Sequence, residues 1–134
     1  MDTNPTIAEI DKARLAAYLA LENKDFATYM GCFSDDLKYK QLNGKIIDKR
    51  QLSDDTKRYF DRITTNTGTY DRLNSSVDDG LFTETIIQKT IVIISVFIFF
   101  SKKWTVEREG IYKWKKVNGE WKISDVEITS EKPR

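Results

Sequence analysis

Two charged residues fall inside apolar patterns, and they are the first candidates for chemistry. Arg14 lies on the otherwise apolar face of a predicted helix, and Asp125 shares strand parity with Trp121 and Ile123. A buried guanidinium can bind an anionic ligand group or pair with a carboxylate, and Asp125 is the preferred partner. Burial would raise the pKa of Asp125, which makes it a candidate catalytic acid or base. The alternative is an exposed or salt-bridged aspartate.

Three aromatic residues are candidates for lining a ligand pocket. Tyr18, Tyr112 and Trp114 each combine an apolar ring with a polar group. Such side chains can surround a small apolar molecule and still offer it a hydrogen bond. The alternative is that all three belong to the core.

Composition and charge exclude several classes of function. The chain has 134 residues, 22 Lys and Arg against 21 Asp and Glu, and no histidine. A net charge of +1 supplies no basic field, so we expect neither a nucleic-acid nor a membrane partner. Without histidine, Ser-His-Asp and Cys-His nucleophiles and most transition-metal sites are excluded. The adjacent pairs Asp35-Asp36, Asp54-Asp55 and Asp78-Asp79 are typical of caps and turns, so we expect no metal and no cofactor.

The ends and the cysteine content favour a cytoplasmic location. Residues 1–5 show no basic stretch followed by an apolar one, which argues against a secretory signal. Cys32 has no second cysteine with which to pair, and its neighbours favour a small buried side chain. The apolar run from Ile91 to Phe100 is shorter than the roughly 20 residues that a membrane helix needs, and it is typical of a strand.

The candidate residues must be positioned by helices in the first half of the chain and strands in the second. A first helix is predicted with Asn4 or Thr6 as its cap, where Thr6 and Glu9 can form a capping box. Asn23 and Asp25 can cap a short second helix that ends near residues 34–36. Asp48, with Gln51 three residues later, predicts the start of a third helix.

Strands are predicted by turn dipeptides between β-branched and aromatic runs. Asn43-Gly44 predicts a type I′ turn in a small hairpin between residues 37–42 and 45–47. Four further strands are predicted at residues 69–78, 81–100, 104–117 and 120–129, with turns at 79–80, 101–103 and 118–119. Helices followed by an antiparallel meander indicate a single α+β domain over residues 1–134.

The apolar run from Ile91 to Phe100 breaks the strand pattern. In an antiparallel strand with one solvent-exposed face, apolar and polar residues alternate, but this run is apolar on both faces. We therefore expect a homodimer in which a second copy covers the sheet. Cover by the C-terminal segment or by a loop is the alternative.

Several short motifs resemble one known superfamily. They are Glu22-Asn23-Lys24-Asp25-Phe26, Phe33-Ser34-Asp35-Asp36, Asn43-Gly44-Lys45, Tyr112-Lys113-Trp114 and Val117-Asn118-Gly119-Glu120-Trp121-Lys122-Ile123. With the order of elements, they resemble the SnoaL-like, nuclear-transport-factor-2-like superfamily. The resemblance implies a cystatin-like α+β roll: a cone-shaped, curved antiparallel sheet wrapped around N-terminal helices, with a pocket between them. Many members dimerise through the sheet.

The resemblance also places candidate site positions. In ketosteroid isomerase, a member of the superfamily, the oxyanion-hole tyrosine corresponds to Ala17, next to Tyr18, and the general-base aspartate corresponds to Gln41. Neither residue type matches, and scytalone dehydratase-like chemistry depends on a histidine that is absent here. Arg14, Ala17, Tyr18, Gln41, Tyr112 and Trp114 are the candidate ligand-binding residues.

The predicted function is therefore a cytoplasmic homodimer that binds a small, largely apolar molecule, with no reaction assigned. One alternative is a cyclase, isomerase or dehydratase that uses Asp125 as acid or base, with Tyr18 or Gln41 orienting the substrate. Another is an association-type oligomerisation module.

Overall fold

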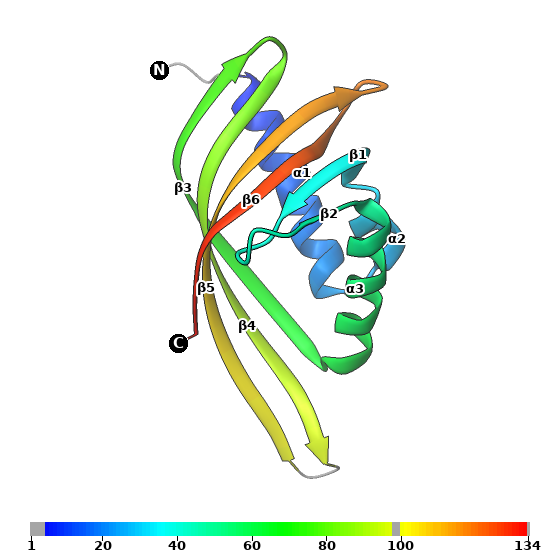
Figure 1. Ribbon diagram of the computed structural model, residues 1–134. Helices are drawn as coiled ribbons and strands as arrows, with labels where there is room; N and C mark the ends of the chain where they lie inside the picture. The colour runs from blue at the N-terminus through cyan, green and yellow to red at the C-terminus, as the bar shows by residue number, and fades with distance from the viewer. Residues whose placement is uncertain (1–4, 98–99, 134) are drawn as a thin grey trace.

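Helices cover one side of a long curved sheet in the computed structural model, which describes residues 5–97 and 100–133 (Figure 1). The helices are α1 (Pro5–Glu22), α2 (Phe26–Met30) and α3 (Lys49–Arg62). The strands are β1 (Phe33–Lys40), β2 (Ile46–Ile47), β3 (Thr65–Asp78), β4 (Leu81–Phe97), β5 (Phe100–Val117) and β6 (Glu120–Pro133). The α+β class and the sheet curved around N-terminal helices are confirmed. None of the described helices is long and apolar enough to span a membrane.

The sheet is mixed, which differs from the all-antiparallel prediction. Its order is β2-β1-β6-β5-β4-β3, and β3 to β6 form the predicted antiparallel meander. The strand β1 pairs in parallel with β6 and antiparallel with β2. The small hairpin thus extends the main sheet at the free edge of β6.

The cap of α3 and two of the turns lie where they were predicted, whereas Thr6 lies inside α1 and does not cap it, and Asn4 lies outside the described residues. The Asp48 carboxylate accepts a hydrogen bond of 2.8 Å from the backbone N–H of Gln51 and caps α3. The residues of the turns at 79–80 and 118–119 all have positive φ, as a type I′ turn requires. At Asn43-Gly44 only the glycine has positive φ, so the type I′ prediction is wrong there.

The second helix is shorter than predicted. It ends at Met30, and the segment predicted to terminate it belongs to β1. The reason is pairing with β6, because Phe33 lies opposite Ile123 and the Ile123 N–H donates to the Cys32 carbonyl at 2.9 Å. Contacts with a strand 90 residues further along the chain decide where this helix stops.

The hairpin between β4 and β5 is longer than predicted. The turn expected at residues 101–103 is wrong, because Ser101, Lys102 and Lys103 lie in β5 opposite Ser95, Ile94 and Ile93. Ile98 and Phe99, which belong to the predicted strand at 81–100, lie outside the described residues. The far end of this hairpin runs past the helices (Figure 1).

The core lies between the inner face of the sheet and the helices, and a glycine shapes its centre. A Cβ at Gly110 would lie 3.2 Å from both Ile128 Cδ1 and Tyr112 Cε1. A Cβ at Gly68 on β3 would meet Tyr18 only at an ordinary contact distance of 3.7 Å. The absence of a side chain at position 110 therefore leaves room for Tyr112 and Ile128.

This difference predicts that alanine is much less well tolerated at Gly110 than at Gly68. We expect Gly110→Ala to lower the free energy of unfolding by about 1–3 kcal/mol, because the added methyl overpacks the core. Gly68→Ala should change it by less than about 1 kcal/mol, since alanine also restricts the unfolded chain. Urea unfolding of both variants measures the two changes, and equal losses would contradict the prediction.

Candidate functional site

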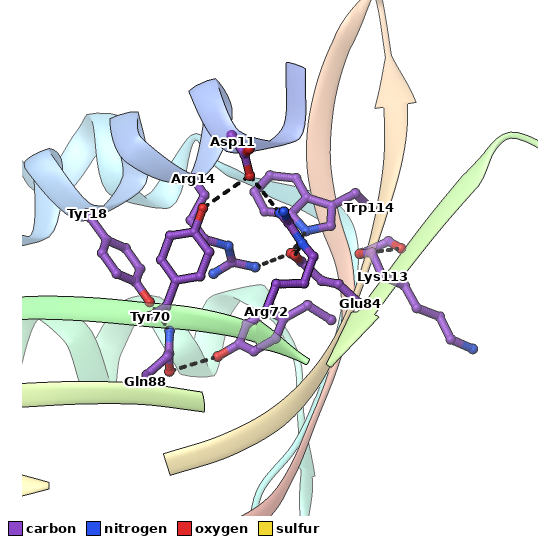
Figure 2. Close-up of polar contacts among 11 residues, drawn as sticks. Asp11, Arg14, Tyr18, Tyr70, Arg72, Glu84, Gln88, Lys113 and Trp114 are labelled. Carbon is purple, nitrogen blue, oxygen red and sulfur yellow. Dashed lines mark hydrogen bonds and ion pairs between the residues drawn. The ribbon is translucent and has the colours of Figure 1, made fainter. Parts of the chain in front are cut away.

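A carboxylate with no exposed surface lies at the centre of the molecule. Glu84 on β4 accepts hydrogen bonds from Arg14 Nη2 and, at 2.6 Å, from Trp114 Nε1 through its Oε2 atom. Its Oε1 atom accepts from Arg72 Nε at 2.9 Å. Figure 2 shows these donors converging on the carboxylate from α1, β3 and β5. Both oxygens of Glu84 are thus occupied by donors from other elements.

A second carboxylate balances the charges of this network. Arg72 Nη2 donates to Asp11 at 2.7 Å, and the Tyr70 hydroxyl donates to the same oxygen at 3.2 Å. Two arginines, Arg14 and Arg72, therefore face two carboxylates, Glu84 and Asp11. Such a neutral set can remain in the interior, with the half-exposed Asp11 at its border, whereas an unbalanced set could not.

Aromatic rings surround the guanidinium of Arg14. Its central carbon lies 4.8 Å from the ring centre of Tyr112, 5.1 Å from that of Tyr70 and 5.2 Å from that of Trp114. These distances fall within the range of cation–π attraction. Burial by itself lowers the pKa of Arg14, but the Glu84 carboxylate together with the nearby Tyr112 and Tyr18 side chains outweighs this effect, and the net pKa is raised. Arg14 is therefore charged at all accessible pH values.

A cavity of about 300 Å³ lies next to this network, between the helices and the inner face of the sheet. Its lining is mostly aromatic and aliphatic. The residues are Arg14, Ala17, Tyr18, Leu21, Glu22, Tyr29, Phe33, Tyr39, Leu52, Asp55, Thr56, Tyr59, Gly68, Gln88, Thr90, Val92, Val106, Arg108, Tyr112 and Ile123.

A short hydrogen-bonded chain gives the cavity a polar edge. The Tyr112 hydroxyl donates to Gln88 Oε1 at 3.2 Å, and Gln88 Nε2 donates to the Tyr18 hydroxyl at 2.7 Å. Burial raises the pKa of Tyr112, and it raises that of Tyr18 to about 12. Both phenols are therefore protonated near neutral pH.

Solved structures share this fold over almost the whole chain, although neither a family model nor a curated protein matches the chain. A conserved protein from Planctomyces limnophilus superposes with a TM-score of 0.86 at 9% identity, covering 98% of this chain and 100% of that one. A scytalone dehydratase-like protein from Novosphingobium aromaticivorans has a TM-score of 0.80 at 10% identity, with 95% and 86% covered. A protein with a cystatin-like fold from Nostoc punctiforme has a TM-score of 0.71 at 16% identity, with 94% and 91% covered.

The chain has a cystatin-like fold. The fold that the sequence motifs implied is confirmed. At identities of 9–16% the likeness concerns the fold. The activity of a cystatin-like protein must be argued from its own site, because one fold carries many functions.

The structure brings four of the predicted site residues together. Arg14, Ala17, Tyr18 and Tyr112 all line the central cavity. Trp114 is not among its lining residues, because its side chain is fully buried against Glu84. The predicted partner of Arg14 was Asp125, and that prediction is wrong: the partner is Glu84.

Asp125 lies on the opposite face of the sheet. Ser124 forms a bulge, since Ile123 pairs with Trp114 and Asp125 pairs with Lys113 on the next position of β5. The extra residue reverses the strand parity, so Asp125 lies beside the exposed Lys113 instead of sharing a face with Ile123. The predicted parity is therefore wrong, and Asp125 is not among the residues that line the cavity.

Gln41 lies outside the central cavity as well. It lines a second hollow beside the β1–β2 turn, together with Tyr39, Arg108 and Glu131. Tyr39 and Arg108 belong to the linings of both spaces. Gln41 is thus separated from Tyr18, with which the resemblance had grouped it.

Sequence reasoning missed the central carboxylate. Phe82, Glu84, Ile86 and Gln88 alternate along β4, and all four point to the inner face with Val92. The signal that marks Arg14, a charged residue at a position where the pattern is apolar, also marks Glu84. Among the described residues, no cluster of three His, Cys, Asp or Glu side chains is arranged to hold a metal ion.

The buried network predicts a large effect of neutralising Glu84. We expect Glu84→Gln to lower the free energy of unfolding by about 3–5 kcal/mol, because it leaves a guanidinium buried without its carboxylate. In the double variant Arg14→Met/Glu84→Gln, the free energy of unfolding should fall by less than the sum of the decreases in the two single variants. Urea unfolding gives all three values.

The matched control is the exposed pair of Arg58 and Asp55 on α3. Arg58→Gln should cost less than about 1 kcal/mol, because exposed ion pairs contribute little. Equal losses for Glu84→Gln and Arg58→Gln would show that Glu84 does not hold the core together.

Proposed function

We propose that this protein binds a small, largely apolar molecule in its central cavity. The observation that carries the proposal is an open space of about 300 Å³ with an aromatic and aliphatic lining and a polar edge formed by Tyr18, Gln88 and Tyr112. Small-molecule sites in proteins have this construction: apolar walls with a few convergent polar groups. The volume lies at the lower end of such sites and suits a molecule of about two or three aromatic rings.

The geometry favours binding over acid–base catalysis. Glu84 is held by three donors and has no exposed surface, so it is not placed to exchange a proton with a ligand. Asp125 lies on the other face of the sheet, and Gln41 lies in the second hollow. The proposed acid or base of the cyclase, isomerase or dehydratase alternative therefore lies outside the cavity, and of the side chains named for it only Tyr18 lines the cavity.

The open cavity also favours binding over a purely structural module. In an association-type module with a vestigial pocket, side chains would fill the space between helix and sheet. Here Ala17 and Gly68 keep the lining small on two sides of the cavity. Small residues facing a cavity leave room for a ligand.

Filling the cavity from α1 tests the proposal. We expect Ala17→Leu to weaken binding of the neutral fluorescent probe N-phenyl-1-naphthylamine by about tenfold or more, which corresponds to about 1.4 kcal/mol. Ala16→Leu is the matched control, because Ala16 is exposed on the same helix. Native mass spectrometry of freshly purified protein should also show a retained small molecule. Failure of the parent protein to bind the probe, or equal binding by both variants, would contradict the proposal.

We also propose that a second copy of the chain covers the far end of the β4–β5 hairpin. Ile91 is 38% exposed and Trp104 is 47% exposed. Trp104 pairs with Val92, so it lies on the face opposite that of Ile91. A projecting hairpin with apolar side chains on both faces is a surface that monomers rarely leave open.

The dimer predicts a concentration dependence in solution. Sedimentation velocity at micromolar concentrations should show dimers, and Ile91→Lys should raise the dissociation constant by about tenfold or more, since it buries a charge. Leu15→Lys is the control, because Leu15 is 59% exposed on α1, away from the hairpin. Monomers of the parent protein at micromolar concentrations would refute the proposed dimer.

A further inference from the structure

Arg108 is an accessible cation in the wall of the central cavity. It lies on the inner face of β5, where it is flanked across the sheet by Gln88 on β4 and Glu131 on β6. Its side chain is 40% exposed, whereas that of Arg14 is 2% exposed. Arg108 also lines the second hollow, so it can be reached from two sides.

The two arginines of the cavity differ in what their charges already do. Arg14 is bound to Glu84 within the core and is surrounded by aromatic rings. Its Nε atom is buried without a hydrogen-bond partner. Arg14 lines the cavity, but its charge is already neutralised by Glu84, so its main role is to hold the structure together.

Arg108 interacts with the Glu131 carboxylate and with the Tyr39 phenol, and the charged partner, Glu131, is replaceable. Arg108 Nε donates to Glu131 Oε2 at 2.7 Å, and the Glu131 side chain is 37% exposed near the end of β6. An ion pair between half-exposed side chains contributes little net free energy, because both charges are well solvated when separated. A ligand carboxylate that approached from the less polar cavity could take the place of Glu131 at small cost.

Two acidic residues, Glu22 on α1 and Asp55 on α3, also line the central cavity. Asp55 also lines a groove with Val92 and Trp104, toward the far end of the hairpin, and Arg108 does not line that groove. The Asp55 carboxylate accepts hydrogen bonds from Arg58 and, at 2.9 Å, from Gln51. These two donors already satisfy the Asp55 carboxylate, and the Arg58 charge offsets its repulsion of a ligand acid group.

We propose that the ligand is an amphipathic monoanion, with its carboxylate bound by Arg108 and its apolar body in the central cavity. This inference rests on the proposed function and specifies the chemical class of the molecule. A planar guanidinium forms two parallel hydrogen bonds with a carboxylate, which neutral acceptors cannot match. The neighbouring Gln88 amide lies on the same row of the sheet, where it can orient the acid group.

The experiment compares a carboxylate with its neutral isostere. Naphthalene-2-carboxylate and naphthalene-2-carboxamide have the same shape, and both are titrated by displacement of N-phenyl-1-naphthylamine. The parent protein should bind the carboxylate about tenfold more tightly. Arg108→Gln should abolish this preference, and Glu131→Gln should strengthen carboxylate binding because it removes the competing acid.

The two variants should change carboxylate affinity in opposite directions, which separates a ligand contact from a structural role. If Arg108 acted only through its ion pair with Glu131, both variants would change the affinity in the same direction. Arg50→Gln is the matched control, because it removes one positive charge from an exposed site on α3. Equal affinities for the two compounds, or a preference that survives Arg108→Gln, would overturn the inference while probe binding upheld the proposed function. Absence of probe binding would overturn both.

Discussion

The ion pair between Arg14 and Glu84 is the constraint on which the rest of the structure depends. Moving either charge into a protein core costs several kcal/mol unless a partner meets it there. Glu84 meets this requirement with Arg14 from α1, Arg72 from β3 and Trp114 from β5. The carboxylate thereby joins the first helix to three strands of the sheet, and any change in their relative position would leave a buried charge unpaired.

The same constraint separates structural from functional charge. Because Arg14 and Arg72 are neutralised within the core, they add no net charge to the cavity beside them. The electrostatic character of the cavity is left to Arg108 on β5, Asp55 on α3 and Glu22 at the end of α1. A rigid core with weakly paired charges at its rim is suited to hold a small molecule in one orientation.

The sequence predicted much of the fold, because many of its signals are local. The Asp48 cap, the turn at residues 118–119 and the order of elements all follow from backbone chemistry within a few residues. The wrong predictions concern places where distant pairing overrides such signals. Helix α2 stops at Met30 because β1 pairs with β6, and the β4–β5 register carries Ser101 into a strand despite its turn-like composition.

For the site, the sequence by itself determined which side chains face inward, because helical and strand periodicity decide such positions. Arg14 was placed on an apolar helix face in this way. Ala17, Tyr18 and Tyr112 were placed on inward faces by the same argument. The sequence could not decide what Arg14 binds, because its partner lies 70 residues away on a strand whose register depends on the assembled sheet. Nor could it place Asp125, because the bulge at Ser124 reverses parity only when β6 is paired with β5. Periodicity is a property of a segment, whereas partners and register are properties of the whole sheet, and only the tertiary structure specifies them.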